Sequence, residues 1–354
     1  MDLLKQKAYR QMLQDLISSF PHWERLEGKD ILISGASGLI GSLLIDTLMQ
    51  HNEDLVPAKQ CRIFAVSRSA EIARQRFVHW VDKDTFQFLS HDIAQPLDDF
   101  TGAPELLIHA ASTTHPAQYT GEPVNTILAN LLGTKNMLDI AAKTPGSRFL
   151  LLSSVEVYGE NRGDVDYFAE DYCGYIDCNT LRAGYPEAKR VSEAMCQAYI
   201  REKHVDALII RLPRCYGPTM RMTDTKALSQ FIKKGLDGED IVLKSEGKQF
   251  YSYAFATDAV LGMLYVLNSG ACGEAYNLAD SGSDITLREL AALVAETAGS
   301  KVVFELPSEA ERIGYSTATK AVMRGNKLSA LGWRPRYDIE TGIKLTMRML
   351  RDGI

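Results

Sequence analysis

The sequence lacks the features that mark membrane proteins and nucleic-acid-binding proteins. Its longest nearly unbroken apolar stretch extends only from Ala259 to Leu267, well short of the roughly 20 residues that a membrane-spanning helix needs. Acidic residues outnumber basic ones, which gives a formal net charge of −6 and no general basic surface for nucleic acid. We therefore expect no membrane and no nucleic-acid partner, while a local basic site for an anionic small molecule remains compatible with this charge.

Cysteine is scarce, and its spacing excludes the common metal and redox motifs. No two of the six cysteines are separated by two residues, the spacing of zinc knuckles and thiol–disulfide motifs. Cys173 and Cys178 lie closest together without a cluster of histidines or cysteines near them, so we expect no metal site. Charged residues also interrupt the apolar positions of the N-terminus, unlike a signal peptide or an anchor. These features predict reduced thiols in a cytoplasmic protein.

What the chain does have is the composition of an ordinary globular protein. Its 354 residues are 45% apolar and 24% charged. At about 150 residues per domain this length predicts two domains, or one large α/β domain with an added lobe. We expect residues 1–28 to form a helical extension that packs on the body or, alternatively, docks a partner. Its apolar residues recur at helical spacing: Leu3, Leu4, Met12, Leu13, Leu16 and Ile17.

From residue 30 onward, short apolar runs alternate with longer helical patterns. Such alternation is typical of βαβ units and predicts a doubly wound, parallel Rossmann sheet over residues 29–212. Shorter mixed segments then predict a smaller C-terminal α/β substrate lobe over residues 213–354, from which a helix near 257–268 returns to the first domain. The expected strands lie within 30–38, 61–68, 86–90, 105–112, 148–154 and 206–212, and the expected helices within 39–50, 124–142 and 186–203.

A glycine triplet joins the first expected strand to the first expected helix. Gly35, Gly38 and Gly41 form the pattern GxxGxxG. Glycine there allows a tight turn, close approach of the backbone to a pyrophosphate, and close packing of the helix. Free N–H groups at the start of the helix would face the phosphates. A plain strand–helix connection has similar glycines, but the strand–turn–helix context favours binding of NAD or NADP.

The end of the second expected strand bears on which dinucleotide binds. An acidic residue there usually binds the ribose 2′-hydroxyl of NAD, whereas this chain has Ser67, Arg68 and Ser69. An arginine suits the 2′-phosphate of NADP, which gives NADP a slight preference; alternatively, Arg68 is a solvated loop residue and NAD binds. Asp92, after the third strand, either accepts a hydrogen bond from the adenine amino group or caps a turn.

A tyrosine and a lysine at helical spacing predict a catalytic pair. Tyr185 and Lys189 lie four residues apart in YPEAK, on one face of an expected helix. An ammonium beside a phenol favours the phenolate, so we expect a lowered pKa for Tyr185. The tyrosine can then act as a general base toward an alcohol whose hydride passes to nicotinamide. Ser154, at the end of a preceding strand, supplies a hydroxyl that could share the proton.

The chain resembles the extended short-chain dehydrogenases/reductases, the NAD-dependent epimerase/dehydratase family, over residues 29–350. The motifs that carry the resemblance are, in order, GASGLIG, HAAS, NLLGT, SSVEVYG, YPEAK, RLPRCYGP and KLSALGWRP. Within the family, the segments HPAQYTGEP, AGYPEAKRVSEAMCQAY and GPTMRMTD are most similar to the UDP-glucuronate decarboxylase branch. The resemblance implies a nucleotide-sugar enzyme whose catalytic set is Ser154, Tyr185 and Lys189.

The resemblance also implies which residues bind the two ligands. Besides Tyr185 and Lys189, those expected to bind the cofactor are Gly35, Ser37, Gly38, Leu39, Ile40, Gly41, Arg68, Asp92, Ile93, Ala110 and Ala111. Those expected to bind the substrate are His115, Tyr119, Asn130, Arg214, Lys226 and Tyr251.

Glu156 is a further candidate for the catalytic set. In decarboxylase and dehydratase relatives a glutamate stands two residues before the tyrosine of the VYG element and contacts the sugar, where a carboxylate can handle a proton. The alternative is a charged residue that faces water at a strand end. The dehydratases have an aspartate immediately before this glutamate, whereas this chain has Val155, which argues against dehydration.

Three departures from the family pattern concern phosphate binding. Arg214 replaces an asparagine that faces the diphosphate, Tyr251 stands where a diphosphate-clamping arginine is common, and Lys226 replaces another phosphate-binding arginine. Arginine and lysine are not equivalent at a bidentate phosphate site. Arg214 could restore the lost charge, or the exchanges could indicate a different nucleotide or sugar.

Three functions remain open from the sequence. The first is an enzyme that oxidises a ring hydroxyl, decarboxylates or epimerises the ketone, and reduces it again with the same bound cofactor. The second is a net NADPH-dependent reductase of a nucleotide-linked keto-sugar, and the third is a non-catalytic NAD(P) sensor.

The expected helices 124–142 and 186–203 also resemble those that pair across a two-fold axis in this family, which predicts a homodimer.

Overall fold

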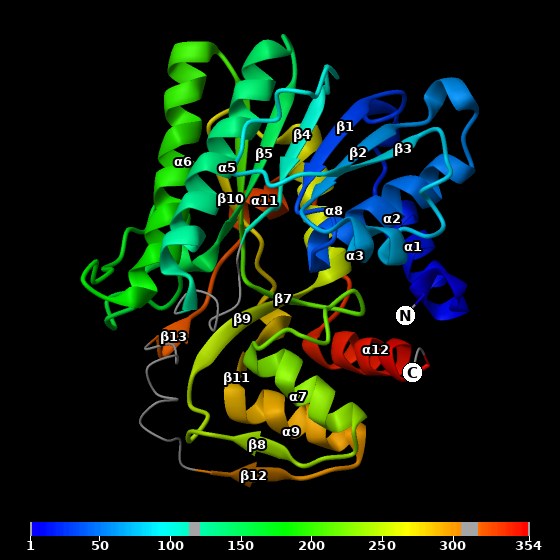
Figure 1. Cartoon of the computed structure of the whole chain (residues 1–354). Coiled ribbons are helices and arrows are strands. Elements are labelled where there is room, and N and C mark those ends of the chain that lie inside the picture. The colour runs from blue at the N-terminus through cyan, green and yellow to red at the C-terminus, as the bar shows by residue number, and fades with distance from the viewer. Residues whose placement is uncertain (1, 113–120, 306–317, 353–354) are drawn as a thin grey trace.

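The structure is a computed structural model that describes residues 2–112, 121–305 and 318–352. Its largest element is a seven-stranded sheet in which neighbouring strands run parallel (Figure 1). The strand order is β10-β6-β5-β4-β1-β2-β3, so the predicted doubly wound sheet is confirmed. Its strands are β1 (Asp30–Ser34), β2 (Arg62–Ser67), β3 (Phe86–Ser90), β4 (Leu106–His109), β5 (Arg148–Ser154), β6 (Asp206–Leu212) and β10 (Ala275–Asn277).

The central strands are apolar along their length because they separate two hydrophobic cores. Successive side chains of a strand point to opposite faces, so Ile31 and Ile33 pack in one core and Leu32 packs in the other. The same alternation sends Leu150 and Phe149 into different cores. A parallel sheet that is covered on both faces needs such continuous apolar runs.

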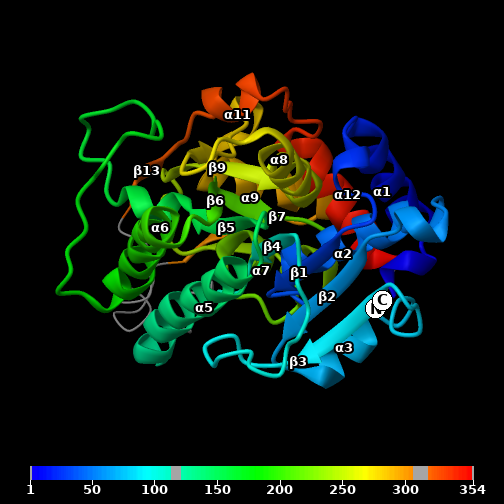
Figure 2. The same ribbon diagram turned by 90° about the horizontal axis from the view of Figure 1, so that it is seen from above.

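Helices cover both faces of this sheet (Figure 2). On one face lie α2 (Leu39–Glu53) and α8 (Ala256–Ser269), and α1 (Lys7–Ser19) packs on both of them. On the other face α5 (Pro123–Lys143) and α6 (Gly184–Lys203) pack against each other and against β4, β5 and β6. The short α3 (Ala70–Arg76) packs beside β3.

The N-terminal extension is anchored to the body through a buried carboxylate. Asp46 on α2 is fully buried and accepts hydrogen bonds from the Tyr9 hydroxyl at 2.6 Å and from the Trp80 indole at 2.9 Å. It also forms an ion pair with Arg76. Leu13 on α1 is fully buried as well. The apolar face of α1 is thus covered by α2 and α8 of the same chain, in place of the partner that the sequence left open.

The chain after β6 builds a smaller part below the large sheet in Figure 1. There β9 pairs with β7, β11 and β13, and β8 pairs with β12. Helices α7, α9 and α12 pack against one another. The strands are β7 (Arg214–Tyr216), β8 (Ile241–Leu243), β9 (Phe250–Phe255), β11 (Asp284–Thr286), β12 (Val302–Phe304) and β13 (Lys320–Ala321). The helices are α7 (Ala227–Leu236), α9 (Leu287–Ala298) and α12 (Ile339–Arg351), whereas α11 (Asn326–Ala330) packs against α8 and close to residues 275–277 of the large sheet.

Two later segments nevertheless belong to the large sheet. Helix α8 packs on β5 and β6, and β10 then adds an edge strand beside β6, with Tyr276 opposite Ile210. The sequence predicted the returning helix but not the three-residue strand. Short 3-10 helices complete the described structure: Leu3–Lys5, Trp23–Arg25, Pro57–Lys59, Val155–Tyr158, Leu181–Ala183 and Ser281–Ser283. Among the described residues, no helix combines the length and apolarity that crossing a bilayer demands.

Candidate active site

A cavity of about 930 Å³ lies between the large sheet and the smaller part. It opens where β1 has β4 on one side and β2 on the other, which is where the connections of the sheet change direction. Ligands of doubly wound sheets bind outside the carboxyl ends of the strands at such a point. The glycine turn after β1, the end of β5 and the start of α6 form one wall, and β7, α7, β8 and β9 contribute the rest.

The glycine turn has a shape that only glycine allows. Gly35 has a φ of +72°, and a Cβ there would lie 2.5 Å from the carbonyl carbon of Ala110. A Cβ on Gly41 would lie 2.4 Å from the carbonyl oxygen of Gly35, so the helix could not pack this closely. Gly38 precedes the first residue of α2 and has no side chain to cap the helix. The N-terminus of α2 is therefore open to an anion, and the turn fits the pyrophosphate of a dinucleotide.

A second basic residue joins Arg68 near this turn. Arg221, from the segment between β7 and α7, donates hydrogen bonds from Nη2 to the Ser37 hydroxyl at 2.8 Å and to the Ser37 carbonyl at 3.0 Å. The hydroxyls of Ser37 and Ser67 lie 2.7 Å apart. Partial burial and the charge of Arg68 lower the pKa of Arg221. The end of β2 thus has two guanidinium groups, whereas the sequence suggested only Arg68.

The other expected cofactor residues lie in different surroundings. Ala110 lines the cavity together with Leu39 and Ile40. Asp92 is exposed and accepts a hydrogen bond from the Ala94 N–H at 3.1 Å, the turn-capping role that the sequence left open. The neighbouring Ile93 is buried, and Ala111 packs against the same core.

Ser154, Tyr185 and Lys189 come together at the cavity wall. Ser154 ends β5, and the other two residues occupy the first turns of α6. Tyr185 is hydrogen-bonded to the hydroxyls of Ser154 and Ser112. The Lys189 ammonium donates to the Leu152 carbonyl at 2.8 Å and lies 5.9 Å from the centre of the Tyr185 ring. The sequence gave no role to Ser112, although it ends the HAAS motif.

The sequence led us to expect a lowered pKa for Tyr185, and this expectation is wrong. Burial, assisted by the negative charge of Glu156, raises the pKa of Tyr185 to about 12, although its hydrogen bonds to Ser154 and Ser112 act in the opposite direction. Burial also lowers the pKa of Lys189 to about 8. Sequence spacing indicated that the two groups are neighbours, but it did not indicate that burial would be the largest cause of both pKa shifts.

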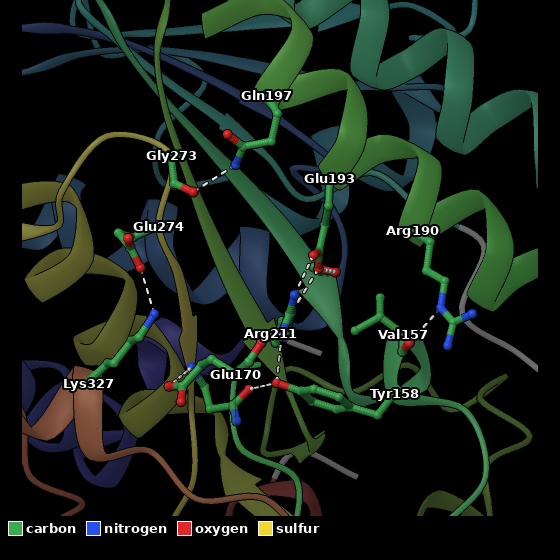
Figure 3. A network of polar contacts seen from close by, with 12 residues as sticks. Val157, Tyr158, Glu170, Arg190, Glu193, Gln197, Arg211, Gly273, Glu274 and Lys327 are labelled. Atoms are coloured by element: carbon green, nitrogen blue, oxygen red, sulfur yellow. Dashed lines mark hydrogen bonds and ion pairs between the residues drawn. The ribbon is translucent and has the colours of Figure 1, made fainter. Parts of the chain in front are cut away.

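A polar network holds α6 against the 3-10 turn Val155–Tyr158, which contains Glu156 (Figure 3). Glu193 on α6 pairs with Arg211 on β6 at 2.7 Å. Arg211 also donates to the Tyr158 hydroxyl at 2.8 Å. Arg190, one turn earlier on α6, donates to the Val157 carbonyl at 2.8 Å. Helix α6 and the turn that contains Glu156 are thereby fixed relative to each other.

Arg214 on β7 and Tyr251 on β9 meet Glu156, which lies across the cavity in the turn that follows β5. Arg214 lies with its guanidinium carbon 3.6 Å from the centre of the Tyr251 ring. Its Nη2 is 3.8 Å from Oε1 of Glu156. All three side chains line the cavity. Two of the three positions that depart from the family pattern, 214 and 251, are therefore in direct contact.

The remaining expected substrate residues are distributed differently. Lys226 lines the cavity and pairs with Asp224 at 2.9 Å. Asn130 is buried behind the wall, where its amide accepts a hydrogen bond from Ser112 at 2.8 Å and donates one to the Thr126 carbonyl at 2.8 Å. It therefore supports a hydroxyl that contacts Tyr185. His115 and Tyr119 lie outside the described residues.

Comparisons with known proteins agree with this arrangement. The model of the NAD-dependent epimerase/dehydratase family matches residues 31–279. UDP-glucuronic acid decarboxylase 1 of Xenopus tropicalis is 32% identical over 349 residues, which are 97% of this chain and 78% of that protein. UDP-glucuronic acid decarboxylase 6 of Arabidopsis thaliana is 30% identical over 89% of this chain and 87% of that protein.

Solved structures share the fold at lower sequence identity. The UDP-glucuronic acid 4-epimerase of Bacillus cereus, in complex with UDP-glucuronic acid and NAD, is 19% identical with a TM-score of 0.77, covering 92% of this chain and all of that one. The dTDP-glucose 4,6-dehydratase of Streptomyces venezuelae, with NAD bound, is 22% identical with a TM-score of 0.78, covering 91% of this chain and 97% of that one.

Proposed function

Because the chain belongs to the NAD-dependent epimerase/dehydratase family, we propose that it modifies the sugar of a nucleotide sugar, beginning with oxidation of a ring hydroxyl. The observation that carries this proposal is the convergence of Ser154, Tyr185 and Lys189 with the glycine turn around one cavity. Residues 29–212 would hold the dinucleotide, and residues 213–354 would close on the sugar nucleotide. The similarity to UDP-glucuronic acid decarboxylases favours UDP-glucuronate as the substrate.

The roles of the residues follow from their contacts. A nicotinamide dinucleotide held at the turn of Gly35, Gly38 and Gly41 would supply the hydride acceptor for the oxidation and the hydride donor for the later reduction. Tyr185 exchanges the proton of the sugar hydroxyl, and the hydroxyls of Ser154 and Ser112, which bond to Tyr185, orient that proton. Lys189 supplies the positive charge that favours the phenolate when the proton moves. Glu156 lines the same cavity, where a carboxylate can take up or release a second proton.

For UDP-glucuronate the proposed chemistry is decarboxylation. Oxidation of the C4 hydroxyl makes a ketone that is β to the carboxylate on C5. The C5–C6 bond then breaks and carbon dioxide leaves. The electron pair of this bond stays on the sugar as an enolate, which is protonated on C5. Reduction of the ketone restores the C4 hydroxyl, so the complete cycle consumes no net oxidant. Epimerisation would use the same oxidised sugar without loss of carbon.

The test is turnover of UDP-glucuronate, monitored by mass detection of the sugar nucleotide and by release of carbon dioxide. We expect Tyr185→Phe to lower kcat by about 10²- to 10⁴-fold, because it removes the group that exchanges the proton. Tyr175→Phe, at an exposed tyrosine, is the matched control and should retain activity. Unchanged turnover in Tyr185→Phe would contradict the catalytic assignment, and turnover of other nucleotide sugars without carbon dioxide release would contradict decarboxylation.

A second candidate function is net reduction of a nucleotide-linked keto-sugar by NADPH. One observation favours it: Arg221 reaches the glycine turn close enough to Arg68 for the two charges to interact. Two guanidinium groups beside Ser37 and Ser67 suit a ribose 2′-phosphate. The solved relatives described above contain NAD, so the choice between NAD and NADP separates the two candidate functions.

The cofactor preference can be measured by titration calorimetry. If Arg68 and Arg221 bind a 2′-phosphate, the protein should bind NADP more tightly than NAD. Arg221→Gln should then weaken NADP by about 10- to 100-fold and leave NAD nearly unchanged, while Arg74→Gln on exposed α3 should affect neither. Tighter binding of NAD by the unaltered protein would instead favour the self-recycling cycle.

We propose a homodimer that pairs through α5 and α6. Val124, Leu128 and Leu132 are exposed apolar residues spaced four apart on α5, so they form one stripe on a single helical face. Val191 adds an exposed apolar side chain on α6. A stripe of this kind suits a self-complementary interface.

The six cysteines are all free thiols, which supports a reducing compartment such as the cytoplasm.

A further inference from the structure

We propose that Arg214 selects sugars that have a carboxylate, by binding this carboxylate beside the reacting carbon. The inference rests on the proposed function, because it concerns the sugar end of the same cavity. It differs from the expectation drawn from the family pattern, in which Arg214 would replace a lost charge at the diphosphate. Its basis is the position, orientation and hydrogen bonding of the guanidinium.

Strand pairing sets the position of Arg214. On β7 it lies opposite Tyr253 of β9. Tyr251, two residues earlier on β9, has its side chain on the same face of the sheet, and its ring stacks against the guanidinium at 3.6 Å. Burial raises the pKa of Tyr253 to about 12, and the positive charge of Arg214 acts in the opposite direction. The two tyrosines thus hold the plane of the guanidinium at the cavity wall.

The neighbours of Arg214 belong to the reacting end of the cavity. Its Nη2 lies 3.8 Å from Oε1 of Glu156, and the negative charge of Glu156 in turn raises the pKa of Tyr185. Cys215, the next residue on β7, acts on Tyr185 in the same direction. A group that binds Arg214 therefore lies close to the phenol that exchanges the sugar proton.

The diphosphate has other cations available to it. Lys226 immediately precedes α7, Lys234 lies near its end, and Lys244 follows β8, and all three line the cavity. They are on the side of the cavity formed by α7 and β8, whereas Arg214 is on β7 beside Glu156. The cavity therefore has cations other than Arg214 that a diphosphate could approach, two of them in ion pairs with Asp224 and Glu239.

The hydrogen bonding of Arg214 leaves room for a carboxylate. Among the described residues, its buried Nη1 has no hydrogen-bond partner. The Glu156 oxygen near Nη2, at 3.8 Å, is an ion-pair partner beyond hydrogen-bond distance. A guanidinium presents its donors in a planar fork that matches the two oxygens of a carboxylate. A neutral hydroxymethyl group offers a single oxygen without charge and would leave part of this fork unsatisfied.

The experiment compares three ligands that share one nucleotide: UDP, UDP-glucose and UDP-glucuronate. The two sugar nucleotides differ only in the carboxylate. Binding is measured by titration calorimetry in the Tyr185→Phe background, in which we expect turnover to be about 10²- to 10⁴-fold slower. We expect Arg214→Gln to weaken the binding of UDP-glucuronate by about 10- to 100-fold. The affinities for UDP and UDP-glucose should change by less than about 3-fold. Lys226→Gln, at another cation of the cavity, should weaken all three ligands by a similar factor.

Arg214→Lys provides a second measurement in case Arg214→Gln does not fold. Lysine keeps the positive charge but lacks the planar fork of donors. The affinity for UDP-glucuronate should therefore fall less in Arg214→Lys than in Arg214→Gln. If Arg214→Gln weakened all three ligands equally, Arg214 would be a diphosphate residue, and the inference would fail while the proposed function stood. The inference would fail in the same way if the unaltered site bound UDP-glucose as tightly as UDP-glucuronate. Failure of both sugar nucleotides to bind would overturn the proposed function as well.

Discussion

Lys189 is an ionisable group whose burial opposes its charge. The lysine is almost fully buried, and burial lowers its pKa to about 8 from 10.5. A folded-state pKa below the unfolded value means that protonation favours the unfolded chain. The resulting cost to stability is fully present below pH 8 and disappears above the unfolded pKa, near pH 10.5. Keeping a charged lysine beside Tyr185 therefore costs stability at neutral pH.

Lys189→Met should therefore stabilise the protein at pH 7 while reducing turnover. The pKa shift corresponds to about 3 kcal/mol, and loss of the hydrogen bond to the Leu152 carbonyl offsets about 1 kcal/mol of it. We expect a gain of about 2 kcal/mol in the free energy of unfolding at pH 7, measured with urea, and little or no gain at pH 10. A variant that is less stable than the parent at pH 7 would contradict this account.

At this scale the sequence predicted identities better than environments. Ser154, Tyr185 and Lys189 could be predicted to lie together because their motifs are local and ordered along the chain, and the structure brings all three to one cavity wall. The raised pKa of Tyr185 could not, because it depends on burial by segments that are distant in sequence. Arg221 was missed for a similar reason: 184 residues separate it from Ser37, to which it is hydrogen-bonded, and no local pattern connects them.

At the scale of elements, α5 and α6 pack together yet keep an apolar stripe exposed. Val124 is 66% exposed and Leu128 is 43% exposed, although both lie on a helix that is otherwise well buried against the sheet. Exposing such a stripe to water is unfavourable, since apolar surface gains roughly 25 cal/mol for each Å² that is covered. A second copy of the same helix pair would cover it.

Leu128→Glu should disrupt the proposed dimer. Two introduced carboxylates would face each other, or an apolar surface, across the two-fold axis, so we expect a monomer by analytical ultracentrifugation at micromolar concentration. The control is Ile72→Glu on the exposed face of α3, which adds the same charge away from the stripe. If Leu128→Glu sedimented like the parent dimer, the interface would lie elsewhere, and a monomeric parent would contradict the dimer itself.

The longer strands of the large sheet could be predicted from sequence, whereas the short strand β10 and the positions of α7, α9 and α12 could not. β1, β5 and β6 are visible in the sequence because apolar side chains must fill two cores at once. β10 has only three residues and follows a glycine-containing turn, so its pattern does not differ from that of a loop. Its place in the sheet depends on pairing with β6, which is a tertiary contact.

At the scale of the whole molecule, the division at residue 212 describes tasks more closely than it describes structure. The cavity takes its walls from both sides of that division. Arg221 belongs to the later part but bonds to the glycine turn of the earlier one. Similarly, Thr219 donates a hydrogen bond to the Leu39 carbonyl at 2.7 Å. The proposed dinucleotide and sugar sites would therefore share a boundary along which one ligand could affect the affinity for the other.

The return of α8 and β10 to the large sheet limits how this protein could be taken apart or recombined. A chain cut after β6 would lack the helix that buries one face of β5 and β6, and its last strand would be a bare edge. The first 212 residues are thus not an autonomous folding unit, although they hold the expected dinucleotide site. Exchanging sugar specificity between relatives by one crossover near residue 212 would replace part of the sheet as well, whereas changes on β7 and β9 would leave it intact.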